Sequence, residues 1–111
     1  MRKPTVSFDD FAKLDLRVGK VVAIDALSGS EKLYKMTVDL GDEYGKKTIL
    51  AGVKPWYTKT RLLGKNFIFI ANLEPRTMMG SESQGMMLAV DGEKPLLIPV
   101  TKTAKPGSPL C

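Results

Sequence analysis

The most restrictive feature of the sequence is the alternation of apolar and polar side chains within residues 33–40. Four apolar residues share one parity and three polar residues share the other: Tyr34, Met36, Val38 and Leu40 against Lys35, Thr37 and Asp39. Successive side chains of a strand point to opposite faces, whereas the apolar positions of an amphipathic helix recur every three to four residues. The period of two therefore predicts a half-buried strand.

Strand patterns also surround this segment. Residues 16–24 carry apolar side chains of one parity, interrupted at Lys20, and the neighbouring Gly19 indicates a β-bulge at that point. Residues 41–45 form a turn, and residues 47–53 return as a third strand. The sequence thus predicts an antiparallel meander of three strands.

Further strands are expected in the second half of the chain. Residues 67–71 form a continuous apolar run, which is typical of a central buried strand. Residues 85–90 and 96–100 are two shorter candidates, and prolines in and before the last one place it at an edge or a bulge. Residues 72–86, which join two of these strands, are predicted to be a functional loop, too long for a tight hairpin.

Two short helices are expected. Ser7 with Asp10 three residues later suits the start of a helix that ends near Lys13. Pro55 can open a second helix through Leu63, with Gly64 as its C-terminal cap and with Trp56 and Tyr57 as packing residues.

This order of elements predicts an all-β fold. Three meandering strands, a short helix and further strands are the arrangement of a five-stranded Greek-key OB-fold barrel, here with short helices and a C-terminal extension. Periodicity alone does not exclude other small β-barrel folds. The length of 111 residues predicts a single domain over residues 1–111.

Composition argues against an enzyme. The chain has no histidine, which removes the common catalytic triads and histidine metal sites, and its only cysteine is Cys111, expected to be an exposed thiol. The acidic pairs at residues 9–10 and 42–43 are explained by a helix start and a turn, and no phosphate-binding glycine loop is present. We therefore expect no metal and no cofactor. With no leader-like segment and no run of about 20 apolar residues, we expect a cytoplasmic location and no membrane partner.

Charge is concentrated in the first part of the chain. Residues 1–65 hold 13 basic and 8 acidic residues, whereas residues 66–111 hold four of each. This excess favours a polyanionic partner. Besides Lys32 and Lys35, the basic residues that can form a stripe on the surface are Arg17, Lys20, Lys46, Lys47, Lys54, Lys59 and Arg61.

The joining segment 72–86 offers a second kind of contact. It combines hydroxyl groups, glycines and Arg76 with methionines, so it can donate to phosphate and present a soft surface to a base or ribose. Met78 and Met87 are more simply explained as residues that fill the barrel, whereas for Met86 packing and binding are equally well supported.

Several motifs together resemble one known family. In order they are Asp10–Gly19, Glu31–Tyr34, Ala51–Val53, Ala71–Arg76 and Gly80–Met86. They are similar to the tRNA-binding OB domain family, which includes the C-terminal domain or beta subunit of methionyl-tRNA synthetases and standalone tRNA-binding proteins. The resemblance spans about Phe8 to Gly107.

The resemblance implies a non-catalytic homodimer that recognises the folded shape of tRNA, alone or with methionyl-tRNA synthetase. The family's Ser-x-Gly-Met loop matches at Ser83, Gly85 and Met86, and its lysine before Leu-Tyr matches at Lys32. The residues expected to contact tRNA are Lys32, Ser83 and Met86, followed by Arg17, Lys54, Asn72 and Arg76.

Two alternatives remain open at this stage. A second branch of the family acts as a protein-secretion chaperone and typically lacks the Ser-x-Gly-Met loop, and a purely structural dimerisation domain would not bind tRNA. The segment Lys46–Thr48 departs from the more usual Arg-Gln, which leaves the basic contacts of the third strand open. The N-terminal segment and residues 91–111 are the expected dimer interface.

Overall fold

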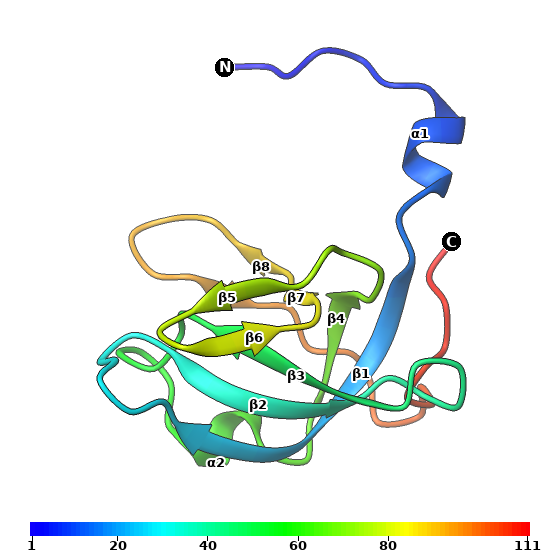
Figure 1. The fold of residues 1–111 in the computed structure, drawn as a ribbon. Helices are drawn as coiled ribbons and strands as arrows, with labels where there is room; N and C mark the ends of the chain where they lie inside the picture. The colour runs from blue at the N-terminus through cyan, green and yellow to red at the C-terminus, as the bar shows by residue number, and fades with distance from the viewer.

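The computed structural model describes all residues, 1–111, and its main feature is one curved antiparallel sheet (Figure 1). The sheet has the strand order β3-β2-β1-β4-β7. Its strands are β1 (Leu16–Ala26), β2 (Tyr34–Asp39), β3 (Lys46–Ala51), β4 (Asn66–Ile70) and β7 (Met86–Met87). The predicted three-stranded meander and the central strand β4 are confirmed, since β4 pairs with β1 on one side and β7 on the other.

Residues 83–85 bring the two edges of this sheet together. Gln84 donates its backbone N–H to the carbonyl of Thr48 at 2.7 Å, and its side-chain oxygen accepts from the Thr48 N–H at 3.0 Å. Leu50 donates its N–H to the hydroxyl of Ser83 at 3.0 Å. These bonds join β3 to the chain entering β7, so the sheet nearly closes into a barrel and the predicted OB-like all-β fold is confirmed.

The alternating strand packs as predicted. Tyr34, Met36, Val38 and Leu40 are buried, and the strands around them contribute Ile49, Phe67 and Phe69 to the same core. The predicted bulge, however, is in the wrong place. The register of β1 against β2 shifts between Val21 and Ala23, so that Val21 is fully buried and Val22 is turned outward.

The segment predicted to be a loop contains a hairpin, which corrects the prediction for residues 72–86. Strands β5 (Arg76–Met78) and β6 (Ser81–Ser83) pair so that Met78 lies opposite Ser81. The two turn residues have positive φ, 51° at Met79 and 79° at Gly80. Turns of this kind match the twist of paired strands, although methionine is an uncommon residue for such a position.

Helix α1 (Phe8–Ala12) lies outside the barrel. The hydroxyl of Ser7 accepts the N–H of Asp10 at 3.0 Å, which confirms the predicted cap. No residue of α1 is buried, and Figure 1 shows it with the N-terminal segment extending away from the sheet.

Helix α2 (Lys59–Leu62) is shorter than predicted, because residues 52–56 form turns instead of helix. Gly64 follows it with φ of 77°. Tyr57 is buried and donates its hydroxyl to the carbonyl of Pro95, whereas Trp56 is 44% exposed and is not the packing residue that the sequence predicted.

The last strands differ in extent from the prediction. In place of strands over 85–90 and 96–100, the structure has β7 and a separate ladder of β8 (Ala89–Val90) with β9 (Leu96–Leu97). The C-terminal extension then runs back along β1, where Ser108 accepts the Val18 N–H at 2.9 Å and Leu110 donates to Leu16 at 2.9 Å. Cys111 is exposed as expected. Neither helix is long and apolar enough to cross a membrane.

Candidate functional site

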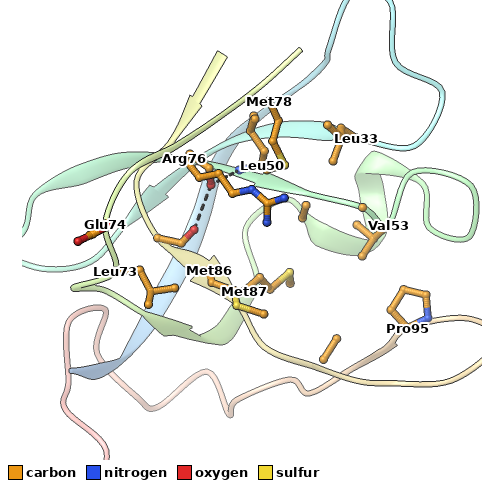
Figure 2. A pocket seen from close by; sticks show the side chains of 15 residues that line it. Leu33, Leu50, Val53, Leu73, Glu74, Arg76, Met78, Met86, Met87 and Pro95 are labelled. Carbon is orange, nitrogen blue, oxygen red and sulfur yellow. Dashed lines mark hydrogen bonds between the residues drawn. The ribbon is translucent and has the colours of Figure 1, made fainter. Parts of the chain in front are cut away.

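A groove of about 580 Å³ opens between β3, the β5–β6 hairpin and β7 (Figure 2). Its apolar walls include Leu33, Leu50, Val53, Leu73, Met78 and Pro95. The polar groups at its surface include the side chains of Glu74 and Arg76. A mostly apolar cleft of this volume with a few polar groups is the usual form of a ligand site. We call it the hairpin groove.

Three of the residues expected to bind line this groove, namely Arg76, Ser83 and Met86. Arg76 lies on β5 directly opposite Ser83 on β6, and its exposed side chain forms no ion pair within 4.0 Å. Met86 begins β7 beside Ile70 and is 49% exposed. The neighbouring Met87 is buried in the core, as predicted. The two methionines therefore separate into an outward and an inward side chain.

Ser83 has a different role from Arg76 and Met86. Its side chain is buried, and its hydroxyl donates to the Gly85 carbonyl at 3.0 Å while it accepts the Leu50 N–H. A Cβ atom at position 85 would lie 2.9 Å from the Ile70 carbonyl oxygen, so only glycine fits there without a shift. Ser83 and Gly85 thus set the shape of the groove, and the side chains exposed in it come from their neighbours.

Lys32 and Lys54 lie at the rim of the groove. Their neighbours Leu33 and Val53 line it, and the Lys54 backbone N–H donates to the Lys32 carbonyl at 3.2 Å. The Lys54 ammonium also donates to the Ser30 carbonyl at 3.2 Å, while the Lys32 side chain is exposed. We call Lys32, Lys54 and Arg76 the basic rim.

Arg17 lies outside this site, in a compact ion-pair cluster. Its guanidinium donates to both carboxylate oxygens of Asp15, at 2.7 and 3.1 Å, to Glu43 at 3.2 Å and to the Gly107 carbonyl at 3.0 Å. Its side chain is 13% exposed, and the Tyr44 hydroxyl donates to Asp15 as well. The cluster joins the start of β1, the β2–β3 turn and the C-terminal extension.

Asn72 also has a structural role. Its amide nitrogen donates to the Lys13 carbonyl at 2.7 Å, and its side-chain oxygen accepts the Asp15 N–H at 2.8 Å. Both ends of the amide are used to hold the segment between α1 and β1 against the end of β4. The structure therefore places three of the seven expected residues in the lining of one groove and Lys32 and Lys54 next to residues of that lining. Arg17 and Asn72 form supporting contacts elsewhere.

The apolar walls of the groove are the feature of the candidate site that the sequence did not predict. Leu33 and Leu73 stand beside expected contact residues, and Leu73 is 38% exposed. The signal was present in Leu33, an apolar residue on the otherwise polar parity of residues 33–40. A groove with apolar walls and a basic rim can hold a flat apolar surface and an anionic group at the same time.

The contrast between Ser83 and Met86 gives a first prediction. Replacing Ser83 by alanine leaves the buried Leu50 N–H without its acceptor, which is expected to cost about 1–3 kcal/mol of unfolding free energy. Met86→Ala, at a half-exposed position, is expected to leave stability within about 0.5 kcal/mol of wild type. Urea denaturation of both variants measures this, and equal losses would contradict the assignment.

The Arg17 cluster gives a second prediction. Hydrogen bonds from Arg17, then from Tyr44, hold the pKa of Asp15 below its usual value, and the bond to Asp15 raises the pKa of Tyr44. Because the folded-state pKa of Asp15 is depressed, its contribution is complete above the unfolded value of about 3.9 and is lost as pH falls through the folded pKa. The stability difference between wild type and Asp15→Asn should therefore shrink below about pH 4. Denaturant curves between pH 7 and pH 2.5 measure the unfolding free energy of both proteins. A difference that stays constant over this range would show that the Asp15 carboxylate does not contribute as stated.

Comparison with known proteins agrees with this architecture. The family model described as "Putative tRNA binding domain" matches residues 16–109. Among sequence relatives, methionine–tRNA ligase of Thermococcus kodakarensis is 48% identical over 104 residues, which are 93% of this chain and 14% of that protein. Methionine–tRNA ligase of Methanocella arvoryzae is 45% identical over 105 residues, 95% of this chain and 15% of that protein. The chain thus spans about a seventh of the curated relatives it matches.

Solved structures match over nearly the full length. The MetRS-related protein of Pyrococcus horikoshii superposes with a TM-score of 0.90 at 33% identity, covering 98% of this chain and 100% of that one. The CsaA chaperone of Picrophilus torridus gives 0.87 at 26% identity, with 96% and 100% covered. The match over residues 16–109, together with these relatives, means that the chain belongs to the tRNA-binding OB domain family and is related to methionyl-tRNA synthetases.

Proposed function

We propose that the domain binds folded tRNA without catalysing a reaction, through the hairpin groove and its basic rim. The observation that carries the proposal is the meeting of Arg76 and Met86 in one groove with Lys32 and Lys54 at its edge. These residues come from three separate stretches of the chain, so their convergence is a property of the fold.

The chemistry of the groove suits RNA. Lysine and arginine on the rim neutralise phosphates, and Met86 with the apolar walls offers a surface to a base or ribose outside a helix. Ser83 maintains the shape of the groove, and Arg17 and Asn72 act indirectly by holding the termini against the barrel. Recognition through charge and shape is consistent with a preference for folded tRNA over a particular base sequence.

Lys32 is the contact on the rim that is easiest to test. Its side chain is exposed and free of ion pairs, so Lys32→Ala should leave the fold intact. Loss of one phosphate contact should reduce the slope of log affinity against log salt by about 0.7–0.9. A titration series from low to physiological salt measures this, and an unchanged slope would remove Lys32 from the interface.

We also propose that the domain acts as a homodimer. The side chains of Val6, Phe8, Phe11 and Leu14 are 67%, 78%, 42% and 43% exposed on a segment that projects from the barrel. Exposed apolar residues gathered on one segment favour contact with another protein surface. A second copy would cover this arm and place two grooves on one tRNA.

The whole chain would then work as a single tRNA-binding domain, either alone or as a module appended to or associated with methionyl-tRNA synthetase in the cytoplasm. In the second setting, a domain tethered to the synthetase raises the local concentration of tRNA near that enzyme. The relation to methionine–tRNA ligases supports a synthetase as the partner.

Competition between RNAs tests the proposal. Labelled folded tRNA is bound near physiological salt and displaced by unlabelled tRNA or by unstructured RNA of equal length. Purely electrostatic binding, with a dissociation constant of about 10⁻⁴–10⁻⁶ M, treats the two competitors alike. We expect folded tRNA to compete at least about tenfold better; equal competition would overturn shape recognition.

A second candidate function is binding of peptide segments, as in a secretion chaperone. It is favoured by the apolar walls of the groove and by the similarity to the CsaA chaperone of Picrophilus torridus. If an unfolded polypeptide displaced labelled tRNA from the groove more effectively than folded tRNA did, this candidate would replace the first.

A further inference from the structure

A second groove, of about 550 Å³, lies between the C-terminal extension and the start of β4. Its walls come from β1 at Lys20, from the residues Gly64–Asn66 that lead into β4, and from residues 99–106. None of the residues that line it is acidic, and few are hydrophobic. We call it the C-terminal groove. It shares no residue with the hairpin groove.

The walls of this groove are fixed by hydrogen bonds. Asn66 is buried, and its amide nitrogen donates to the carbonyls of Thr101 and Ala104 at 3.3 and 3.1 Å. Its backbone carbonyl accepts the Val100 N–H at 2.9 Å. On the other side, the Lys65 carbonyl accepts the Val21 N–H at 3.1 Å. The extension is thus held against the sheet, and the concave shape is part of the native structure.

Three lysines from separate segments line the groove: Lys20, Lys65 and Lys102. All three are exposed, and none lies within 4.0 Å of a carboxylate. Asp39 pairs with Lys20 across the β1–β2 ladder, but its carboxylate accepts the Gly41 N–H instead of an ammonium. The Lys65 ammonium donates only to a neutral group, the Thr60 carbonyl, at 3.4 Å. Three ammonium groups without a carboxylate partner around one concave surface create a positive potential that favours an anion with several charges.

We propose that the C-terminal groove is a second phosphate-binding site, which holds the RNA backbone of the same tRNA through Lys20, Lys65 and Lys102. The choice of RNA as the ligand rests on the proposed function. The two grooves lie at opposite ends of β4, since Asn66 borders this groove and Ile70 pairs with Met86 at the other. Four residue steps of a strand span about 13 Å.

Because of this separation, the C-terminal groove contributes to RNA affinity independently of the hairpin groove. About 13 Å of strand exceeds the Debye length of about 8 Å at physiological ionic strength, so salt largely screens charges at one end of β4 from a phosphate bound at the other end. A ligand that reaches both grooves must be extended and rigid enough to present phosphates at two places. A folded tRNA meets this requirement better than a short single strand.

The test is a charge-removal series on the full chain. Lys20→Gln, Lys65→Gln and Lys102→Gln are combined in one variant, and the matched control removes three exposed lysines that line neither groove and lie outside the basic stripe: Lys3, Lys13 and Lys94. The groove variant should bind tRNA at least about tenfold more weakly at 0.15 M salt, with a salt slope smaller by about 2–3. Arginine at the same three positions should restore most of the affinity, because it keeps the charge.

Two readouts separate this inference from the proposed function. If the groove variant keeps wild-type affinity and slope, or loses no more than the control, the second site is overturned even where wild type prefers folded tRNA. If wild type binds folded and unstructured RNA alike, shape recognition fails. The salt slopes of wild type, the groove variant and the control on unstructured RNA still decide whether the C-terminal groove binds phosphate. Thermal denaturation of each variant confirms that all compared proteins are folded.

Discussion

Replacing Gly19 by alanine is expected to lower the unfolding free energy by about 2–3 kcal/mol, within the range for inserting atoms into a packed core. A Cβ atom at this position would lie 2.5 Å from the Phe69 ring and 2.6 Å from a methyl carbon of Val38. Both side chains are fully buried at the centre of the core, so neither can move aside without displacing its neighbours. Urea denaturation measures the loss.

Gly52→Ala is the matched control for this change. No atom lies within 4 Å of a Cβ built there, and the backbone has no positive φ, so the variant should be neutral or slightly more stable. Combining Gly19→Ala with Phe69→Leu, which shortens the clashing ring, should cost less than the sum of the two single changes. Equal stability of the two alanine variants, or strict additivity of the pair, would show that Gly19 is not required by packing.

Gly19 also illustrates what the sequence could and could not predict about the fold. Glycine within a strand is compatible either with a bulge or with the close approach of a neighbouring side chain, and the pattern of residues 16–24 does not separate the two. The bulge lies two to three residues later, between Val21 and Ala23, where two adjacent valines give no indication of which faces inward. The strand of residues 34–39 was predictable because each of its side chains carries its own polarity signal.

The β5–β6 hairpin and the candidate site also divide into features that the sequence predicts and features that it does not. The sequence does not predict the turn at Met79–Gly80, because methionine rarely adopts positive φ, and a loop is therefore the expectation for residues 72–86. The predictions for Lys32 and Met86 rest on motifs that are contiguous in sequence. The tertiary partners of Arg17, by contrast, include Glu43 and Gly107, which are 26 and 90 positions away, and no local pattern indicates that its donors are already in use.

Disrupting the apolar N-terminal arm, the segment that carries Val6, Phe8, Phe11 and Leu14, is expected to have the largest effect on tRNA binding. Phe8 and Phe11 present rings 6.2 Å apart on α1, and they are 78% and 42% exposed in a helix with no buried residue. If the arm joins two copies, Phe8→Ser with Phe11→Ser should yield a monomer with an intact barrel. Affinity for tRNA should then fall about a hundredfold or more, because a dimer that engages one tRNA through two barrels gains about 10²–10⁴ from linkage.

Val22→Ser with Leu63→Ser is the matched control, since both side chains are exposed and apolar and neither belongs to the arm. Sedimentation gives the oligomeric state of each variant, and tRNA titration gives the affinity. If the Phe8→Ser, Phe11→Ser variant is still a dimer, the interface lies elsewhere, and residues 91–98, the part of the C-terminal region before the C-terminal groove, are the next segment to change. A monomeric variant with wild-type affinity would show that one barrel suffices to bind tRNA, and that the arm serves another partner. Only a monomer with weakened binding supports the arrangement of two barrels on one tRNA.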